Sequence, residues 1–396
     1  MYLKTFNEYE CCGCSACESI CPKSCIKMMP NKEGFKYPVI VDKDECINCG
    51  LCERVCAFEK KEKIRNTNPS CYYGWHLDPT IRRNSTSGAA FIAISQVCRD
   101  LGYNLFCGAV YDQNNRVQHI CTNDFEKIFS MRTSKYVQSD LQNTLQEIKK
   151  LLKQGEKVLF SGTPCQSMGL KSLVGEQYDE NLITVSLVCH GVSSPLCFEK
   201  YKESVEKKYS SKVESIKFRD KKIKDGKMNH KFTTIALKNG KLIESVDDPY
   251  TMMFGLGYMH RKSCSRCQYA TPLRNCDITI GDFWGIQLLN PELSDELSKG
   301  ISLVLGHSPK GETICALLNK YMKIEKMSSY TKAVNPYQQQ LSRPFAENPH
   351  RETFIQKAIA GNFMKEAKKF LLFRKIKNVC NIQLQKISKG LRGISK

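Results

Sequence analysis

The first sixty residues contain two copies of a cysteine pattern that is typical of metal ligands. Each copy reads Cys-x-x-Cys-x-x-Cys-x-x-x-Cys, and each cysteine of the first copy recurs 35 positions later. Three closely spaced thiolates hold one cubane cluster, while the following turn carries the fourth thiolate to a neighbouring cluster. Structural zinc sites seldom combine a triplet with one further cysteine in this way. The eight predicted ligands of two 4Fe-4S clusters are Cys11, Cys14, Cys17, Cys21, Cys46, Cys49, Cys52 and Cys56.

The fourth cysteine of each copy is expected to bind the cluster of the other copy. We name the two resulting ligand sets cluster one and cluster two. The predicted ligands are Cys11, Cys14, Cys17 and Cys56 for cluster one, and Cys21, Cys46, Cys49 and Cys52 for cluster two. Cys12 lacks the two-residue gap to Cys14 and is predicted to be a spare cysteine. Two neighbouring clusters indicate a one-electron relay rather than a catalytic site.

Two further cysteines follow predicted strands in the central part of the chain. Residues 157–161 form a short apolar run before Cys165, and residues 182–188 form another run before Cys189. Strands that alternate with helices indicate α/β units, in which ligands gather beyond the carboxyl ends of the strands. We therefore expect Cys165 and Cys189 to face one crevice.

A separate Cys-x-x-Cys pair is formed by Cys264 and Cys267. Such a pair supplies two thiolates and needs partners from elsewhere, for which Cys165, Cys189 and Cys276 are the candidates. By itself the pair fits zinc, a redox dithiol or an iron-sulfur cluster. Because it follows a two-cluster module, a third 4Fe-4S cluster is the favoured interpretation.

The elements around these cysteines predict a mixed-sheet α/β domain. Apolar residues at helical spacing mark a helix that stops at Gly102, a strand over 104–111 and a second helix that ends at Gly155. The predicted fold is an α+β ferredoxin-like dicluster module, then the α/β domain, then a helical basic tail. The expected boundaries are 1–65 for the module, 70–155 and 156–330 for two α/β regions, and 350–396 for the tail.

The charge of the chain is concentrated in its tail. The formal net charge is +20, and residues 351–396 carry +10 of it. No helix-turn-helix, zinc-finger or RNA-recognition signature accompanies this charge, so nucleic acid is not an expected partner. The tail has apolar residues every three or four positions and predicts an amphipathic helix. Two interpretations stay open: a helix docked on the domain or a partner, and peripheral contact with an anionic membrane surface. The apolar positions are Ile359, Phe363, Ala367, Phe370, Phe373, Ile376, Cys380, Leu384 and Ile387.

The remaining sequence suggests a cytoplasmic chain. It has no apolar run of about 18 residues that could span a membrane, and its polar start does not resemble a signal peptide. Cysteine-rich cytoplasmic chains favour metal or redox chemistry over a disulfide framework. Ten cysteines are left without a ligand role and are expected to be mostly small buried apolar residues. They are Cys12, Cys25, Cys71, Cys98, Cys107, Cys121, Cys197, Cys276, Cys315 and Cys380.

Six motifs between residues 70 and 290 resemble the coenzyme F-420 hydrogenase/dehydrogenase beta-subunit family. They are Ser-Thr-Ser-Gly at 85–88, Ser-Lys-Tyr-Val-Gln-Ser at 134–139, Leu-Phe-Ser-Gly-Thr-Pro-Cys-Gln at 159–166, Cys-His-Gly-Val at 189–192, Cys-x-x-Cys at 264–267 and Asp-Ile-Thr-Ile-Gly-Asp-Phe-Trp-Gly at 277–285. The resemblance implies an FAD-binding domain with its own 4Fe-4S cluster. In that family the flavin exchanges a hydride with a deazaflavin coenzyme, and the clusters carry single electrons. Members with an N-terminal ferredoxin module are found in bacterial polysaccharide gene neighbourhoods.

The resemblance also implies roles for individual residues. It assigns the third cluster to Cys165, Cys189, Cys264 and Cys267, with Cys276 as a reserve ligand. The implied flavin contacts are Ser87, Gly88, Ser134, Lys135, Tyr136, Gly162 and Thr163, with Asp282 near the same crevice. His190 is the candidate for proton handling. The alternatives are a helix cap at Ser87, a solvated Lys135, a packed turn around Asp282 and a hydrogen-bonded structural role for His190.

Two functions follow from these observations. The first is an FAD-dependent oxidoreductase of an anaerobe that couples hydride transfer to electron transfer through clusters. The second is a non-catalytic subunit that delivers electrons to a partner enzyme. The expected partner is a redox protein or a hydride-carrying coenzyme, with deazaflavin, NAD(P)H and ferredoxin as the candidates. Bound flavin would distinguish the two functions.

Overall fold

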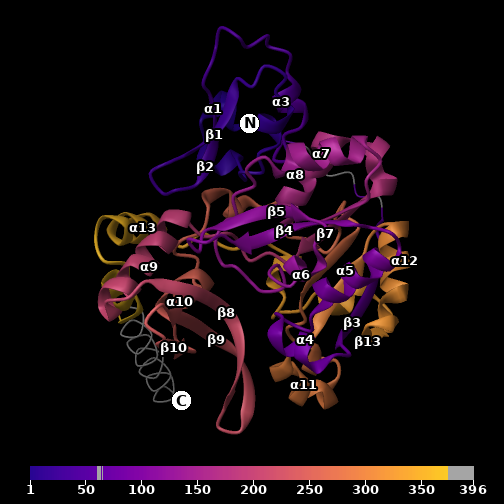
Figure 1. Ribbon diagram of the computed structural model, residues 1–396, viewed down its shortest axis with the longest axis vertical. Helices are drawn as coiled ribbons and strands as arrows, with labels where there is room; N and C mark the ends of the chain where they lie inside the picture. Colours follow the sequence, from indigo (N-terminus) through magenta and orange to yellow (C-terminus); the bar gives the residue numbers. More distant parts are fainter. Residues whose placement is uncertain (60–63, 65, 373–396) are drawn as a thin grey trace, which may run out of the picture.

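The computed structural model describes residues 1–59, 64 and 66–372. Its N-terminal module lies at one end of the molecule (Figure 1) and combines short helices with one two-stranded antiparallel sheet. Its elements are α1 (Tyr2–Thr5), η1 (Glu8–Glu10), α2 (Ala16–Ile20), β1 (Ile26–Pro30), β2 (Lys36–Ile40) and α3 (Leu51–Arg54). The predicted cluster ligands therefore lie on short turns and helices, which leave the cysteines close to one another.

An eight-stranded mixed sheet forms the centre of the body and confirms the predicted mixed α/β architecture. The strand order is β13-β3-β12-β11-β7-β6-β4-β5. The four strands β11, β7, β6 and β4 are mutually parallel, and the outer strands pair antiparallel. Their bounds are β3 (Ser70–His76), β4 (Leu105–Tyr111), β5 (Val117–Thr122), β6 (Val158–Gly162), β7 (Leu182–Leu187), β11 (Ile278–Asp282), β12 (Ser302–Gly306) and β13 (Met322–Lys326).

Helices cover both faces of this sheet because alternate residues of its strands point to opposite sides. In β6, Leu159 packs with residues of α5, whereas Val158 and Phe160 pack with residues of α7 and α8. The predicted helices before Gly102 and Gly155 are observed as α5 and α7. The helices on the sheet are α4 (Pro79–Asn84), α5 (Ala90–Asp100), α6 (Phe125–Ile128), α7 (Thr144–Lys153), α8 (Pro164–Val174), α11 (Ser294–Lys299) and α12 (Pro309–Leu317).

A second hydrophobic core surrounds a three-stranded antiparallel sheet in order β10-β9-β8. Its aromatic residues are contributed by the strands and by helices that lie next to this sheet in Figure 1. The elements are β8 (Val213–Lys224), β9 (Lys227–Leu237), β10 (Leu242–Ser245), α9 (Pro195–Tyr209), α10 (Pro249–Gly255) and α13 (Arg351–Ala360).

The beginning of the predicted tail packs onto this second core. Phe363 and Ala367 are fully buried, and Ile359 and Phe370 pack against the same cluster. The described part of the apolar stripe therefore faces the body of the protein. The predicted positions Phe373, Ile376, Cys380, Leu384 and Ile387 lie outside the described residues. In the described ranges, no helix is long and apolar enough to cross a membrane.

One expectation about the cysteines is wrong. Cys107 and Cys121, which we expected to be unpaired apolar residues, form a disulfide. The physical reason is sheet register: the two residues are direct partners on β4 and β5, with their Cα atoms 4.1 Å apart. Two cysteines that face each other across an antiparallel pair have their sulfurs within bonding reach.

The module is anchored to the body by its β1–β2 turn. Glu33 forms a buried ion pair with Arg351 of α13 at 2.5 Å, and its backbone oxygen accepts a hydrogen bond from the Ser194 hydroxyl. Gly34 lies so close to Leu196 that a Cβ atom at this position would be 2.8 Å from the Leu196 backbone nitrogen. These contacts hold the module in one orientation relative to the sheet.

Candidate metal centres

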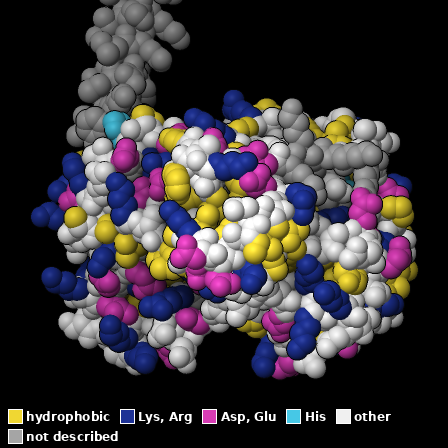
Figure 2. Space-filling view, turned by 90° about the horizontal axis from the view of Figure 1, so that it is seen from above, with side chains coloured by type: hydrophobic (Ala, Val, Ile, Leu, Met, Phe, Trp, Pro, Cys, Tyr) yellow, Lys and Arg dark blue, Asp and Glu magenta, His cyan; other side chains and the backbone are white. Residues whose placement is uncertain are grey.

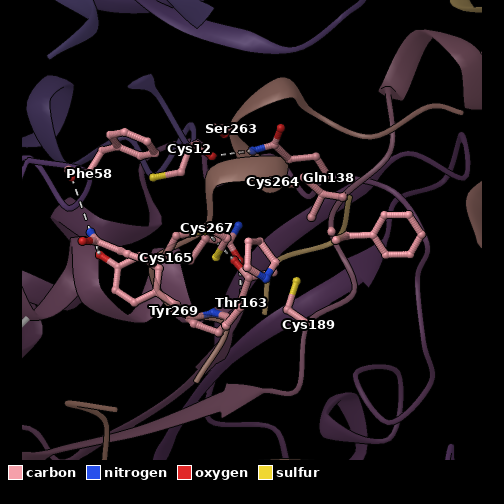
Figure 3. A pocket seen from close by; sticks show the side chains of 18 of the residues that line it. Cys12, Phe58, Gln138, Thr163, Cys165, Cys189, Ser263, Cys264, Cys267 and Tyr269 are labelled. Atoms are coloured by element: carbon pink, nitrogen blue, oxygen red, sulfur yellow. Dashed lines mark hydrogen bonds between the residues drawn. The ribbon is translucent and has the colours of Figure 1, made fainter. Parts of the chain in front are cut away.

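A pocket between the module and the body is lined by five cysteines: Cys12, Cys165, Cys189, Cys264 and Cys267 (Figure 3). Cys12 belongs to the module. Cys165 lies in the first turn of α8 directly after β6, and Cys189 follows β7. Because β6 and β7 are parallel neighbours, their carboxyl ends meet at the same edge of the sheet. The pocket therefore brings together the four cysteines that the resemblance assigns to a third cluster.

The thiols of this pocket act on one another electrostatically. Burial raises the pKa of Cys264 to about 12 and that of Cys267 to about 11, and the charge of Cys165 contributes to both shifts. Burial also raises the pKa of Cys189, and the neighbouring charges of Cys264, Cys165 and Cys267 raise it further. All four sulfurs are therefore near one another in a desolvated site. Such a donor set fits a metal cluster, which binds thiolates and offsets the cost of deprotonating the buried thiols.

Cys165 differs from the other three pocket cysteines. A hydrogen bond from Cys12 lowers the pKa of Cys165 to about 7 despite burial, and the Thr163 hydroxyl and Arg261 contribute. Thr163 caps α8, and its Oγ1 lies 3.2 Å from the Cys165 sulfur. The reserve candidate Cys276 does not line this pocket. It is buried, and its sulfur contacts the Ile278 backbone oxygen at 3.5 Å.

The predicted ligands of cluster one lie close together within the module. Burial raises the pKa of Cys17, and the charges of Cys14, Cys11 and Cys56 raise it further. The exchanged cysteine Cys56 is thus near the triplet of the first copy. In the described residues, no three His, Cys, Asp or Glu side chains converge on the position of a single metal ion. Each thiolate of a four-iron cluster binds a different iron, so a cluster does not require that convergence.

The predicted ligands of cluster two lie in a more open part of the module. Cys49 is exposed, and Cys21, Cys46 and Cys52 are partly exposed. Burial raises the pKa of Cys52, and the charge of Cys49 contributes. Viewed from the module's end, the surface carries charges of both signs around apolar side chains (Figure 2). The exposed apolar residues of the module are Phe6, Met29, Val39, Val41 and Ile47.

Cluster one, in contrast, adjoins the five-cysteine pocket. The Cys12 thiol lies between the two groups. Hydrogen bonding with Cys14, of cluster one, and with Cys165, of the pocket, raises the pKa of Cys12. Gly169 of α8 permits this approach, since a Cβ atom there would be 2.9 Å from the Cys14 sulfur. Helix α2 accordingly contacts α7 and α8. The predicted spare cysteine therefore lies between the two groups of predicted ligands.

A polar group lies beside the pocket and includes both predicted catalytic residues. His190 directly follows Cys189. Burial lowers the pKa of His190, with Asp282 opposing and Arg219 adding to the shift. Asp282, at the end of β11, forms an ion pair with Arg219 at 3.3 Å. Burial raises the pKa of Tyr136, against the lowering effect of Arg219. The Tyr136 ring stacks on Phe254, with ring centroids 4.3 Å apart.

The other predicted flavin contacts lie in three places. Gly162 and Thr163 lie at the end of β6, where Thr163 lines the pocket. Ser134 is bound through its backbone N–H to Thr86 Oγ1 at 2.9 Å, which joins the two predicted flavin segments. The Lys135 ammonium donates to the backbone oxygens of Ser130 and Thr133, each at 3.0 Å. Burial lowers the pKa of Lys135 to about 7.

Ser87 and Gly88 have partners within the chain. The Ser87 hydroxyl donates to the Ile301 backbone oxygen at 2.8 Å, and the Gly88 N–H donates to Ser302 Oγ at 2.9 Å. A Cβ atom on Gly88 would lie 2.8 Å from the Ser302 nitrogen, so this glycine is required by close packing. These two residues join the segment before α5 to β12.

Two parts of the chain match known families. Residues 155–330 match the family described as coenzyme F420 hydrogenase/dehydrogenase, beta subunit (C terminus), and residues 10–60 match the 4Fe-4S dicluster domain. Residues 155–330 are thus similar to this beta-subunit family. The predicted resemblance and the iron-sulfur character of the module are thereby confirmed. They support an electron-transfer role of the general oxidoreductase type.

A solved structure is also similar to this chain. It is a chain in the xenon-derivatised structure of the F420-reducing [NiFe] hydrogenase complex from Methanosarcina barkeri, with 17% sequence identity and a TM-score of 0.46. The match covers 77% of this chain and 94% of that chain. No curated protein matches the chain.

Sequence reasoning missed two arginines at these sites. Arg219 lies in a basic strand, β8, whose composition suggests a solvated surface, yet its guanidinium is paired with Asp282. Arg261 precedes the Cys-x-x-Cys pair of the beta-subunit family region and is only 1% exposed. An arginine three residues before a cysteine pair was the one available signal, and it has no recognised spacing rule.

Proposed function

We propose that the chain is an iron-sulfur flavoprotein oxidoreductase. It would couple hydride transfer at FAD to one-electron transfer through three 4Fe-4S clusters. The observation that carries this proposal is the pocket in which Cys165, Cys189, Cys264 and Cys267 face one another beside the dicluster module. Residues 1–65 would be the ferredoxin-type domain, 70–155 and 156–330 the two regions of the flavin and cluster domain, and 350–396 a tail.

The pocket cysteines would hold the third cluster. Their sulfurs come from two neighbouring strand ends and from η3 (Lys262–Arg266) with the residue after it. The sheet fixes Cys165 and Cys189, and the short Cys-x-x-Cys segment supplies two adjacent ligands. Cys12 adds a fifth thiol that hydrogen-bonds Cys165 and would tune its basicity.

The residues beside the pocket would orient the flavin and handle a proton. FAD, when bound, supplies the exchange of a hydride for single electrons. His190 is neutral at pH 7 because burial lowers its pKa, so its imidazole can accept a proton. Arg219 and Asp282 hold each other in place by their ion pair. Tyr136 offers a ring already stacked on Phe254, and Ser134 and Lys135 flank it.

A second function is favoured by a specific observation. The donors of Ser87 and Gly88 are bound to Ile301 and Ser302, although a flavin phosphate would need free donors at a helix start. A subunit that holds clusters without flavin and delivers electrons to a partner enzyme requires no such donors. The two functions therefore differ in whether the purified chain carries FAD.

Anaerobic purification followed by flavin extraction tests the choice between them. The oxidoreductase proposal predicts about one FAD per chain and loss of visible absorbance when a hydride donor is added. Reduced deazaflavin, NADH and reduced ferredoxin would be tried separately to identify the partner. Absence of flavin in a chain with its full iron content would contradict the oxidoreductase proposal and support the electron-delivery subunit.

His190→Gln provides a matched test of the proton-handling role. The variant keeps a polar side chain but cannot accept the proton that remains when a hydride is converted into two electrons for the clusters. Reduction of the clusters by the effective hydride donor should therefore slow by about 10²-fold or more. Dithionite delivers single electrons and bypasses this step, so its bleaching rate should not change. Equal rates for wild type and variant with the hydride donor would show that His190 is structural. A role in polysaccharide biosynthesis would follow if a sugar-linked substrate reoxidises the reduced protein.

A further inference from the structure

We propose that Arg261 is a shared counter-charge between cluster one and the third cluster, and that its guanidinium raises the reduction potentials of both. The inference rests on the third cluster of the proposed function. Arg261 would act as a positioning residue, because it would set the reduction potentials of the clusters between which electrons pass from the module to the pocket or back. The sequence patterns assign no role to this residue.

Arg261 lies where the module meets the body. Its Nε donates to the Cys11 backbone oxygen at 2.7 Å, and one terminal nitrogen donates to the Lys36 backbone oxygen at 3.0 Å. The other terminal nitrogen donates to Gln138 Oε1 at 3.0 Å. The guanidinium carbon lies 4.0 Å from the centre of the Tyr37 ring. The side chain is therefore held rigidly by neutral groups of the module and the body.

The positive charge of Arg261 has no carboxylate partner. Across the described parts of the chain, no Asp or Glu oxygen lies within ion-pair distance of its guanidinium. Two acidic residues of the module, Glu8 and Glu33, are instead paired with Lys262 and Arg351. A charge that is 1% exposed is costly to bury without an opposite charge. An anionic group next to Arg261 would remove this cost.

Cysteines of both predicted ligand sets lie next to Arg261. The Arg261 Nε donates to the Cys11 backbone oxygen at 2.7 Å, and the Arg261 backbone oxygen accepts a hydrogen bond from the Cys264 N–H at 3.0 Å. As cluster-bound thiolates, these cysteines would supply the negative charge. The guanidinium thus lies between the two ligand sets.

A cation in this position has a defined effect on electron transfer. A 4Fe-4S cluster with four thiolates carries roughly −2 and gains one negative charge on reduction. The negative charge on one reduced cluster opposes the reduction of its neighbour, and this repulsion is strong in a desolvated interior. Arg261 stabilises the reduced form of either neighbour, so an electron can move between them without a proton or a bond change. Cluster two, with exposed and partly exposed ligands, should be affected least.

The test is a redox titration followed by electron paramagnetic resonance on the anaerobic full-length protein. Arg261→Gln removes the charge, and we expect the ratio of reduced to oxidised form to fall about tenfold at a fixed potential for cluster one and for the third cluster. This corresponds to a midpoint potential lower by about 59 mV for each cluster. Arg261→Lys keeps the charge and should stay within a third of that shift. Equal shifts in Gln and Lys variants would show a purely structural role and overturn the proposal.

A second variant leaves Arg261 in place. Gln138→Glu keeps an acceptor of the same size on the guanidinium but pairs its charge with a carboxylate. It should lower the same two potentials, and unchanged potentials would overturn the proposal even if Arg261→Gln fails to assemble. The matched control is the double variant Lys36→Gln, Asp140→Asn, which removes a partly exposed module–body ion pair with no net change in charge. It should leave all potentials unchanged.

The iron content distinguishes failure of the proposed function from failure of the proposed role of Arg261. A wild-type chain with about eight iron atoms would contradict the third cluster and thereby the proposed function. The effect of Arg261 on cluster one would then still be measurable through Cys11. A different outcome would contradict the role of Arg261 alone: the chain contains about twelve iron atoms, and neither Arg261→Gln nor Gln138→Glu changes the reduction potentials of its clusters.

Discussion

The module and the pocket gather their cysteines in different ways. In the module, turns of two or three residues bring neighbouring cysteines together, so the ligand pattern is visible in a single stretch of sequence. In the pocket, Cys165 and Cys189 depend on two parallel strands and meet a pair that lies far along the chain. The arrangement of the module's cysteines therefore depends on local turns. The arrangement of the pocket cysteines depends on the sheet and on correct docking of the module.

The largest expected effect separates the two sets of ligands directly. Replacing both Cys264 and Cys267 by alanine should remove the third cluster and lower the iron content from about twelve to about eight atoms per chain. The module's spectrum should persist because its ligands are local. Iron analysis and electron paramagnetic resonance would measure both. Cys276→Ala is the matched control, since this buried cysteine does not line the pocket, and it should keep all the iron.

Loss of the buried anchor should have the next largest effect. Arg351→Ala leaves Glu33 buried without a partner, which should cost about 3–5 kcal/mol of the free energy of unfolding. The exposed pair of Lys4 and Glu53 gives the comparison, because Lys4→Ala should cost at most about 1 kcal/mol. Anaerobic denaturant titrations of both variants would show the difference. Equal small losses would mean that the module does not depend on this anchor.

Gly169→Ala should give a smaller effect that concerns the contact between module and pocket. The added methyl group would lie 2.8 Å from the Cys14 Cβ, and such overpacking typically costs about 1–3 kcal/mol. Gly255→Ala in α10 is the control, since a Cβ atom there meets nothing within 4 Å and a helix gains from alanine. The free energy of unfolding of both variants would be measured by denaturant titration. Equal values for Gly169→Ala and Gly255→Ala would contradict the close contact.

The sequence predicted those features that depend on local pattern. The strands before Cys165 and Cys189 follow from apolar runs and are observed as β6 and β7. The two ligand sets of the module follow from spacing and stay a prediction. The mixed sheet follows from the alternation of strands and helices. The match of residues 155–330 confirms the resemblance that the motifs indicated.

Features that depend on long-range contact could not be read in this way. The disulfide of Cys107 and Cys121 results from the register of β4 against β5, which no spacing rule encodes. The donors of Ser87 and Gly88 are taken by Ile301 and by Ser302 of β12, more than 200 positions away. The position of Arg261 between the two groups of cysteines could not be predicted from the sequence, because its hydrogen-bond partners come from both the module and the body.

The most direct test of the central claim is the iron and acid-labile sulfide content of the anaerobically purified full-length chain. Three clusters predict about twelve iron and about twelve sulfide ions per chain, with three reducible paramagnetic centres of which two interact. This result would establish that the pocket holds a cluster beside cluster one. A content of about eight of each, with only two centres, would contradict the account and leave the pocket cysteines without a cluster.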